Sequence, residues 1–253
     1  MATRESAVRV GLVYPELLGT YGDRGNALVL VQRCRWRGID AELVEVVAGE
    51  PIPDSLDVYL FGGGEDDPQN MAAAGLRASR AAIERGWRGG GVVFAVCAGF
   101  QLIGHSYVAA DGAVLEGIGL IDAVTHAGPS RLIGEVVVDP APPLPRLTGF
   151  ENHGGRTTLG PGVAPLGRVV SGGGNGDGSG TDGALAERLV GTYLHGPVLP
   201  RNPALADQVL RWVVGDLPLL DSAWEERLRA ARIAAGTRTG LAKWWQDSML
   251  ARG

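Results

Sequence analysis

The chain has 253 residues, of which 45% are hydrophobic, 20% are charged and 40 are glycines. Its formal net charge of −5 argues against a nucleic-acid partner held through phosphate contacts, and no apolar stretch reaches the roughly 20 residues that span a bilayer. Two distant cysteines, Cys34 and Cys97, do not make a disulfide framework, and no Cys/His spacing predicts a metal site. With no signal peptide visible, we expect a cytoplasmic protein.

The first hundred residues alternate between strand-like and helix-like segments. Strands are predicted at residues 8–14, 41–47, 58–61 and 92–96, and helices at residues 26–36 and 71–87. Such alternation is typical of a mostly parallel, twisted sheet with right-handed crossovers and helices on both faces. We therefore predict an α/β fold in three layers.

After Gly104 the pattern changes. Short apolar runs at 114–124 and 132–138 predict hairpins, and the glycine- and serine-rich stretch 171–183 predicts a mobile surface loop. A strand at 189–194 ends at His195 and is followed by predicted helices at 202–214 and 222–249, the second interrupted near Gly236 and Gly240. We expect one domain, residues 1–215, and a helical C-terminal extension, residues 216–253. The extension, which holds Trp224, Trp244 and Trp245, packs on its own domain or on a partner.

Cys97 follows the continuous apolar strand 92–96 and stands between small residues. Ala95 and Gly99, two positions on either side, would let the strand and the next helix approach closely, as in the nucleophile elbow of hydrolases. The thiol would project at the carboxyl end of the sheet, at a helix N-terminus that favours the thiolate. The alternative is a buried structural cysteine, which is our interpretation of Cys34.

A thiol nucleophile needs a base and an oxyanion site. His195 is the best candidate base because it ends a predicted strand, where sites of α/β sheets form, and His153 is the competitor. One oxyanion donor would be the backbone N–H of Ala98. The glycine run after residues 58–61 would supply the other, from Gly64 or Gly63, unless this run is only a structural turn.

Three segments together resemble the class I glutamine amidotransferases, in the branch of cobyric acid synthase. They are Phe61-Gly62-Gly63-Gly64, Cys97-Ala98-Gly99-Phe100-Gln101 and Thr192-Tyr193-Leu194-His195-Gly196. Two further segments are similar to the GatD-type glutaminase subunits of that branch: Tyr21-Gly22-Asp23-Arg24-Gly25-Asn26 and Phe150-Glu151-Asn152-His153-Gly154-Gly155-Arg156-Thr157. Together the matching segments fall within residues 10–200. The resemblance implies the flavodoxin-like three-layer fold of class I amidotransferases.

The resemblance also implies a reaction and a partner. L-Glutamine would be hydrolysed through a Cys97 thioester, with His195 as acid and base and with no cofactor in this chain. The ammonia would pass to a MurT-like Mur ligase subunit, which forms a heterodimer with the glutaminase. That partner would bind ATP, Mg²⁺ and lipid II, and it would amidate the D-glutamate of lipid II.

Most class I amidotransferases carry His-Pro-Glu, whereas this chain has His195-Gly196-Pro197, so the orienting carboxylate is missing. Either a Cys–His pair suffices or the acid comes from elsewhere, and Asp23 is the candidate, although an aspartate there could simply cap a helix. Arg131, with Arg156 as runner-up, is predicted to bind the α-carboxylate of glutamine. Gln101 would bind glutamine too, or else face solvent.

Two other functions stay open on the residues alone. The same glutaminase chemistry could serve another acceptor, such as a corrinoid precursor. A non-catalytic α/β interaction module with a buried Cys97 is the second alternative.

Overall fold

The computed structural model describes residues 6–20 and 22–250, and their side chains except at 66–67 and from 238 onwards. Tyr21 and the side chains of Trp244 and Trp245, which entered the sequence predictions, lie outside this part. Among the described residues, no helix combines the length and apolarity needed to cross a membrane.

The first sheet has six strands in the order β11-β12-β4-β3-β1-β2. Five of them run parallel: β1 (Val8–Val13), β2 (Ala41–Val46), β3 (Val58–Phe61), β4 (Val92–Val96) and β12 (Leu189–Thr192). The edge strand β11 (Ala184–Ala186) is antiparallel to β12. Every residue of β3, β4 and β12 is buried, as expected for central parallel strands covered on both faces.

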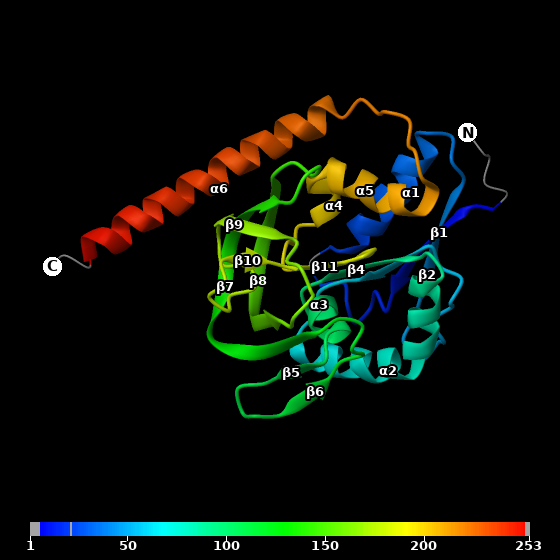
Figure 1. Ribbon diagram of the computed structural model, residues 1–253, viewed down its shortest axis with the longest axis horizontal. Coiled ribbons are helices and arrows are strands. Elements are labelled where there is room, and N and C mark those ends of the chain that lie inside the picture. Colours follow the sequence, from blue (N-terminus) through cyan, green and yellow to red (C-terminus); the bar gives the residue numbers. More distant parts are fainter. Residues whose placement is uncertain (1–5, 21, 251–253) are drawn as a thin grey trace.

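Helices cover both faces of this sheet, which confirms the predicted three-layer α/β fold (Figure 1). One face carries α1 (Arg24–Arg35), α4 (Val198–Arg201) and α5 (Pro203–Val214), and the other carries α2 (Asp66–Arg88) and α3 (Ala98–Ile103). Helix α2 begins five residues earlier than predicted, because Pro68 lies in its first turn, where the missing N–H costs nothing.

A second, mostly antiparallel sheet supplies the predicted hairpins. Its strands are β5 (Ser106–Val108), β6 (Val114–Glu116), β7 (Ala123–Pro140), β8 (Leu147–Leu159), β9 (Gly167–Ser171) and β10 (Thr181–Asp182). The long β7–β8 pairing shifts register between Ala127 and Leu132. The predicted run 114–124 is split between β6 and β7, and 132–138 is only the middle of β7.

The stretch 171–183 is not the mobile loop that its composition predicted. The Glu151 carboxylate accepts the N–H groups of Gly173 and Gly174 at 2.7 and 2.9 Å. Asn175 is fully buried and exchanges two side-chain hydrogen bonds with the backbone of Gly183, at 3.0 and 2.7 Å. The glycines bring the backbone close to these polar side chains, so the loop is held from within the protein.

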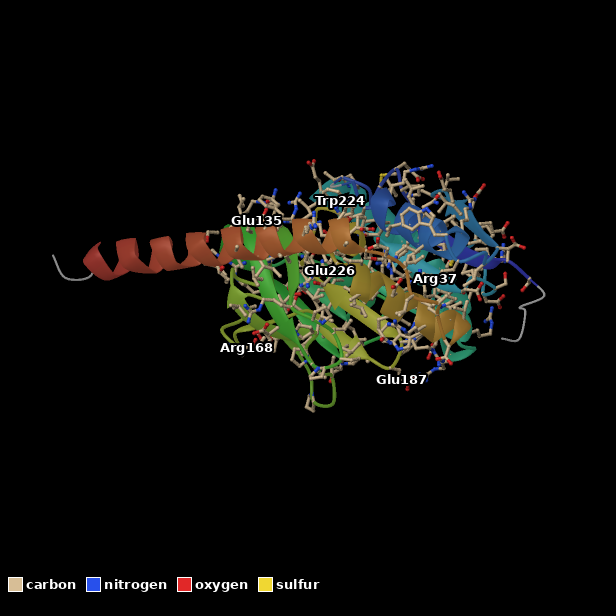
Figure 2. The ribbon with its side chains drawn as sticks, turned by 90° about the horizontal axis from the view of Figure 1, so that it is seen from above. Arg37, Glu135, Arg168, Glu187, Trp224 and Glu226 are labelled. Atoms are coloured by element: carbon tan, nitrogen blue, oxygen red, sulfur yellow. The ribbon has the colours of Figure 1, made fainter. Side chains whose placement is uncertain are left out.

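Helix α6 (Ala223–Leu250) is continuous, so the predicted interruption near Gly236 and Gly240 is wrong. Gly236 lies against the second sheet, where a Cβ would be 3.0 Å from Val137 Cγ2, and its carbonyl accepts the Ser171 hydroxyl at 3.0 Å. The absence of a side chain at Gly236 therefore lets α6 pack closely against the second sheet. Figure 1 shows the helix crossing β7–β9 and extending beyond them. At its start Trp224 stays 78% exposed (Figure 2).

Candidate active site

Cys97 occupies a sharp turn between β4 and α3. Its backbone has φ of 50° and ψ of −106°, a left-handed conformation that is rare for a residue with a side chain and is often found at functional sites. Gly99 donates its N–H to the Gly62 carbonyl at 3.0 Å, and a Cβ at Gly99 would lie 2.7 Å from the Phe61 carbonyl oxygen. The elbow is therefore as tight as the sequence predicted.

His195 comes from the strand next to β4. Strand β12 pairs with β4 so that Thr192 lies opposite Val96, and the Cys97 N–H donates to the Thr192 carbonyl at 2.9 Å. His195 follows three residues later and exchanges both backbone hydrogen bonds with Phe150 of β8, at 2.8 and 3.1 Å. The two sheets thus hold Cys97 and His195 at one edge, where they are 5% and 1% exposed.

Burial favours the neutral form of both groups. Burial, reinforced by the negative charge of Asp23, raises the pKa of Cys97 to about 12, although the Ala98 N–H and Arg131 act to lower it. Burial and the neighbouring His153 lower the pKa of His195 to about 3. The sequence predicted a thiolate stabilised by the helix N-terminus. Burial favours the thiol instead, because the loss of water raises the pKa more than the Ala98 N–H at the start of α3 lowers it.

Asp23 lies at the start of α1, 2% exposed, with Oδ2 3.9 Å from His195 Nδ1. The same oxygen accepts the Gly63 N–H at 2.7 Å, and Oδ1 accepts the Asn26 amide at 3.3 Å. The carboxylate makes no capping hydrogen bond to α1, so the helix-cap alternative is wrong. Burial raises the pKa of Asp23 to about 6 despite the hydrogen bonds from Gly63 and Asn26, which lower it.

The glycine turn after β3 narrows the choice of oxyanion donors. The Gly63 N–H is already bonded to Asp23, and the Gly63 carbonyl accepts the Thr20 N–H at 3.2 Å. Gly63 is therefore not available as a donor in this structure, which corrects that part of the prediction. Gly64 remains, and it must lack a side chain because a Cβ there would be 2.7 Å from the Leu17 carbonyl oxygen. The Ala98 N–H lies beside the thiol, whose pKa it lowers.

The two candidate arginines have different environments. Arg131 is exposed, lies where β7 and β8 lose their register, and donates to Asn152 Oδ1 and O at 3.1 Å. Its charge acts on the Cys97 thiol, so it lies near the site. Arg156 instead donates to the carbonyls of Gly154, Gly155 and Ser130, at 3.2, 3.0 and 2.8 Å. Arg156 thus holds the segment that carries Arg131.

A buried polar chain runs behind Cys97 from α2 to β8. Gln101, 6% exposed, accepts the Gln69 amide at 2.8 Å and donates to the Tyr193 hydroxyl at 3.3 Å. The hydroxyls of Tyr193 and Thr157 lie 2.6 Å apart. Gln101 therefore does not face solvent, and its amide is occupied within the protein. Its predicted contact with glutamine stays a prediction.

His153 is buried, and it lies close enough to His195 to lower the pKa of that imidazole. Its ring stacks on Tyr193 with centroids 3.6 Å apart, Nδ1 is 3.0 Å from the Gly155 carbonyl, and Nε2 is 3.8 Å from Glu151. Sequence reasoning assigned no role to Asn26, Gln69, Glu151 or Tyr193. Asn26, Glu151 and Tyr193 each lie in a motif that also holds a candidate residue, but their contacts within the site come from the fold.

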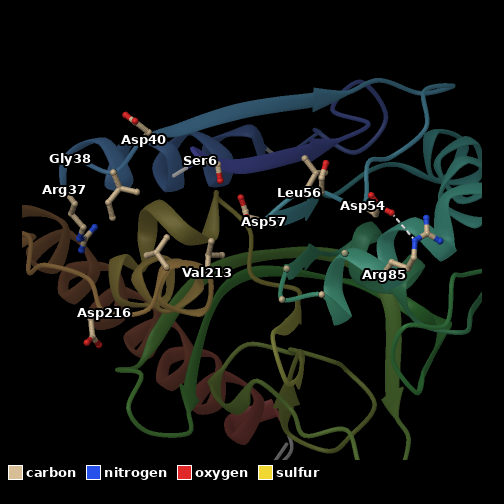
Figure 3. Close-up of a pocket in the computed structure, with 17 residues that line it drawn as sticks. Ser6, Arg37, Gly38, Asp40, Asp54, Leu56, Asp57, Arg85, Val213 and Asp216 are labelled. Carbon is tan, nitrogen blue, oxygen red and sulfur yellow. Dashed lines mark hydrogen bonds and ion pairs between the residues drawn. The ribbon is translucent and has the colours of Figure 1, made fainter. Parts of the chain in front are cut away.

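A cavity lies at the opposite edge of the first sheet, away from Cys97 and His195 (Figure 3). It measures about 920 Å³ and is lined by residues that precede strands β1–β4, among them Ser6, Asp40, Asp57 and Gly91. Its Arg85 is paired with Asp54 at 3.0 Å. Within the described part of the chain, no group of His, Cys, Asp and Glu side chains is placed to hold a metal ion.

Comparison with known proteins agrees with this geometry. The model of the CobB/CobQ-like glutamine amidotransferase domain matches residues 9–203. The chain is 37% identical over 194 residues to the lipid II isoglutaminyl synthase (glutamine-hydrolyzing) subunit GatD of Staphylococcus aureus, covering 76% of this chain and 79% of that protein. The same subunit of Streptococcus pneumoniae is 36% identical over 201 residues, covering 79% and 77%.

More distant relatives share parts of the chain or its fold. Cobyric acid synthase of Sphingopyxis alaskensis is 31% identical over 176 residues, which are 67% of this chain and 34% of that protein. A crystal structure of a glutamine amidotransferase superposes with a TM-score of 0.56 at 17% identity, over 82% of this chain and all of that one. PurLQS of Thermotoga maritima gives a TM-score of 0.55 at 16% identity, over 82% and 99%. At these identities the two structures support the fold alone.

Proposed function

The chain belongs to the CobB/CobQ-like glutamine amidotransferase family, and we propose that it is the glutaminase subunit of a lipid II isoglutaminyl synthase. The observation that supports the glutaminase part is that Cys97, in its strained elbow, and His195 follow the carboxyl ends of the adjacent parallel strands β4 and β12. The lipid II part is supported by the two GatD relatives, which align over more than three quarters of their length.

The first half-reaction forms a thioester and releases ammonia. Arg131 binds the α-carboxylate of L-glutamine, and the thiol proton passes from Cys97 to His195 as the sulfur attacks the side-chain carbonyl carbon. The N–H groups of Ala98 and Gly64 stabilise the oxyanion that develops. When this intermediate collapses, His195 returns the proton to the departing nitrogen, so that ammonia leaves and a glutamyl thioester remains.

The second half-reaction regenerates the thiol. His195 takes a proton from a water molecule, whose oxygen attacks the thioester carbonyl within the same oxyanion site. Collapse breaks the carbon–sulfur bond, releases glutamate and returns the proton to the sulfur of Cys97. In both halves the imidazolium forms 3.9 Å from the Asp23 carboxylate, whose negative charge stabilises it. Asp23 thereby takes the part that the missing glutamate of His-Pro-Glu plays elsewhere.

Ammonia becomes useful only if it reaches an activated acceptor before it is protonated in water. We therefore place ATP, Mg²⁺ and lipid II on a MurT-like Mur ligase subunit that forms a heterodimer with this chain and receives the ammonia through a channel. The relatives' description as subunits supports this division of labour. The proposal assigns no cofactor to this chain and places the complex in the cytoplasm.

Glutamate release from L-glutamine, by the purified chain alone and together with a MurT-like ligase, tests the proposal. Cys97→Ala should abolish glutamate release. Cys34→Ala, which changes a buried cysteine on α1, should leave glutamate release unchanged. Equal release by wild type and Cys97→Ala would remove the nucleophile assignment, and no release under either condition would favour a non-catalytic module. Amidation of lipid II by the two proteins in the presence of ATP would identify the acceptor. Amidation of a corrinoid instead would overturn the assignment of lipid II as the acceptor.

A further inference from the structure

Asn26 is a buried polar residue that none of the catalytic steps uses directly. It lies in the first turn of α1, is 2% exposed, and makes side-chain hydrogen bonds to two different segments. Its Nδ2 donates to Asp23 Oδ1 at 3.3 Å, and its Oδ1 accepts the Leu199 N–H at 2.9 Å. An amide is suited to this place because it carries a donor and an acceptor without a charge.

The two partners of Asn26 belong to different parts of the site. Asp23 accepts the Gly63 N–H at 2.7 Å, in the glycine turn 62–64 after β3, which we call the oxyanion turn. The same carboxylate lies 3.9 Å from Nδ1 of the base, His195. Leu199 lies in α4, directly after the turn that follows His195. The start of α1 also packs against that turn, since a Cβ at Gly25 would be 2.5 Å from Pro197 Cγ.

One carboxylate oxygen, Asp23 Oδ2, faces both the oxyanion turn and the base. A carboxylate can rotate about its Cβ–Cγ bond. Such a rotation would break the hydrogen bond from the Gly63 N–H and move the negative charge of Oδ2 away from His195. The hydrogen bond from Asn26 to the other oxygen opposes this rotation. Two titratable groups interact electrostatically with this carboxylate: His195, at 3.9 Å, and Cys97, whose pKa it raises.

We propose that Asn26 is a positioning residue for the glutaminase reaction, which holds the Asp23 carboxylate between the Gly63 amide and the His195 imidazole. It thereby sets the separation between the oxyanion turn and the base, although it touches neither substrate nor reacting atoms. This inference rests on the proposed glutaminase activity.

Asn26→Asp tests the inference, because it keeps the shape and the acceptor but replaces the donor with a second carboxyl group. We expect kcat to fall about 10- to 100-fold, as for small misplacements of catalytic groups. We also expect the acidic limb of the pH–rate profile to move up by about one pH unit, because two adjacent carboxyl groups share a proton. KM for glutamine should change less than about threefold, because Asn26 is not placed to contact the substrate.

Asn175→Asp is the matched control. The Asn175 side chain is also fully buried, accepts one backbone N–H and donates Nδ2 to a carbonyl, but both of these groups belong to Gly183. The control should lose thermal stability to a similar degree without moving the pH–rate profile. If Asn26→Asp does not fold, Asn26→Ser, which removes both hydrogen bonds without adding charge, should lower kcat and leave KM unchanged.

A double-mutant cycle separates positioning from structure. If Asn26 acts through Asp23, Asn26→Asp added to Asp23→Asn should cost no further activity. Additive losses, or an Asn26→Asp profile with an unmoved acidic limb, would overturn the inference. Assays use the full chain with its ligase partner. An inactive wild type would count against the proposed function itself. If the wild type is active and Asn26→Asp behaves like Asn175→Asp, only the inference about Asn26 is overturned.

Discussion

The Cys97 N–H donates to the Thr192 carbonyl oxygen across the neighbouring strands β4 and β12, at 2.9 Å. This bond ties the nucleophile turn to the strand that leads to His195. It places both functional groups at the carboxyl edge of the sheet, which is the edge where α/β folds form their sites. The thiol is buried there, and its reactivity follows from that burial.

The first prediction concerns the reactivity of the thiol without substrate. Because burial raises the pKa of Cys97 to about 12, alkylation by iodoacetamide should be slow at pH 7. The logarithm of its rate should rise with unit slope from pH 6 to 9.5, followed by mass spectrometry of the Cys97 peptide. A plateau beginning near pH 7 would show a thiolate already formed and contradict this reading of the site.

The second prediction is that Asp23→Asn stabilises the protein above pH 6 while it lowers glutaminase activity. The pKa of Asp23 is raised from 3.8 to about 6, so the folded state favours the neutral acid. Its contribution to stability is full below pH 4 and is lost as pH rises to 6. Asparagine avoids that loss and can still accept the Gly63 N–H.

Urea unfolding of wild type and Asp23→Asn between pH 4 and pH 8 measures this effect. The gain in the free energy of unfolding should be on the order of 2–3 kcal/mol above pH 6 and vanish near pH 4. A gain that is larger at pH 4 than at pH 8 would have the wrong sign and would refute the assigned shift.

The third prediction concerns glutamine binding. Arg131→Lys should raise KM for glutamine about 10- to 100-fold with little change in kcat, because lysine lacks the fork that binds a carboxylate through two hydrogen bonds. Arg168→Lys is the control, since Arg168 is on β9 and its side chain is 72% exposed. Equal KM values for the Arg131 and Arg168 variants would remove Arg131 from the substrate site.

The fourth prediction concerns the elbow. Gly99→Ala should destabilise the fold by about 1–3 kcal/mol, because the new Cβ would lie 2.7 Å from the Cβ and the carbonyl oxygen of Phe61. Gly154→Ala is the comparison, since a Cβ there meets nothing within 4 Å. Chemical denaturation of both variants gives the two free energies. A Gly99 variant as stable as the Gly154 variant would mean that the elbow is looser than the structure shows.

Several features of the fold could be predicted from short stretches of sequence. The parallel strands are continuous apolar runs, such as residues 92–96, and their burial on both faces follows from that composition alone. The elbow at Cys97 was predictable because its small neighbours lie within two positions along the chain. The loop 171–183 and helix α6 were misjudged for one reason: composition reports the flexibility of a glycine but not whether a neighbouring surface packs against it.

The sequence by itself determined the α/β architecture, the family resemblance, and the candidates Cys97 and His195, because these depend on local periodicity and contiguous motifs. Only the tertiary structure decided that the Cys97 thiol is buried, that Gly63 is hydrogen-bonded to Asp23, and that Asn26 connects Asp23 to Leu199. Those features depend on burial and on hydrogen bonds such as Gly63 to Asp23 and Leu199 to Asn26, which join residues 40 and 173 positions apart and exist only after the chain has folded.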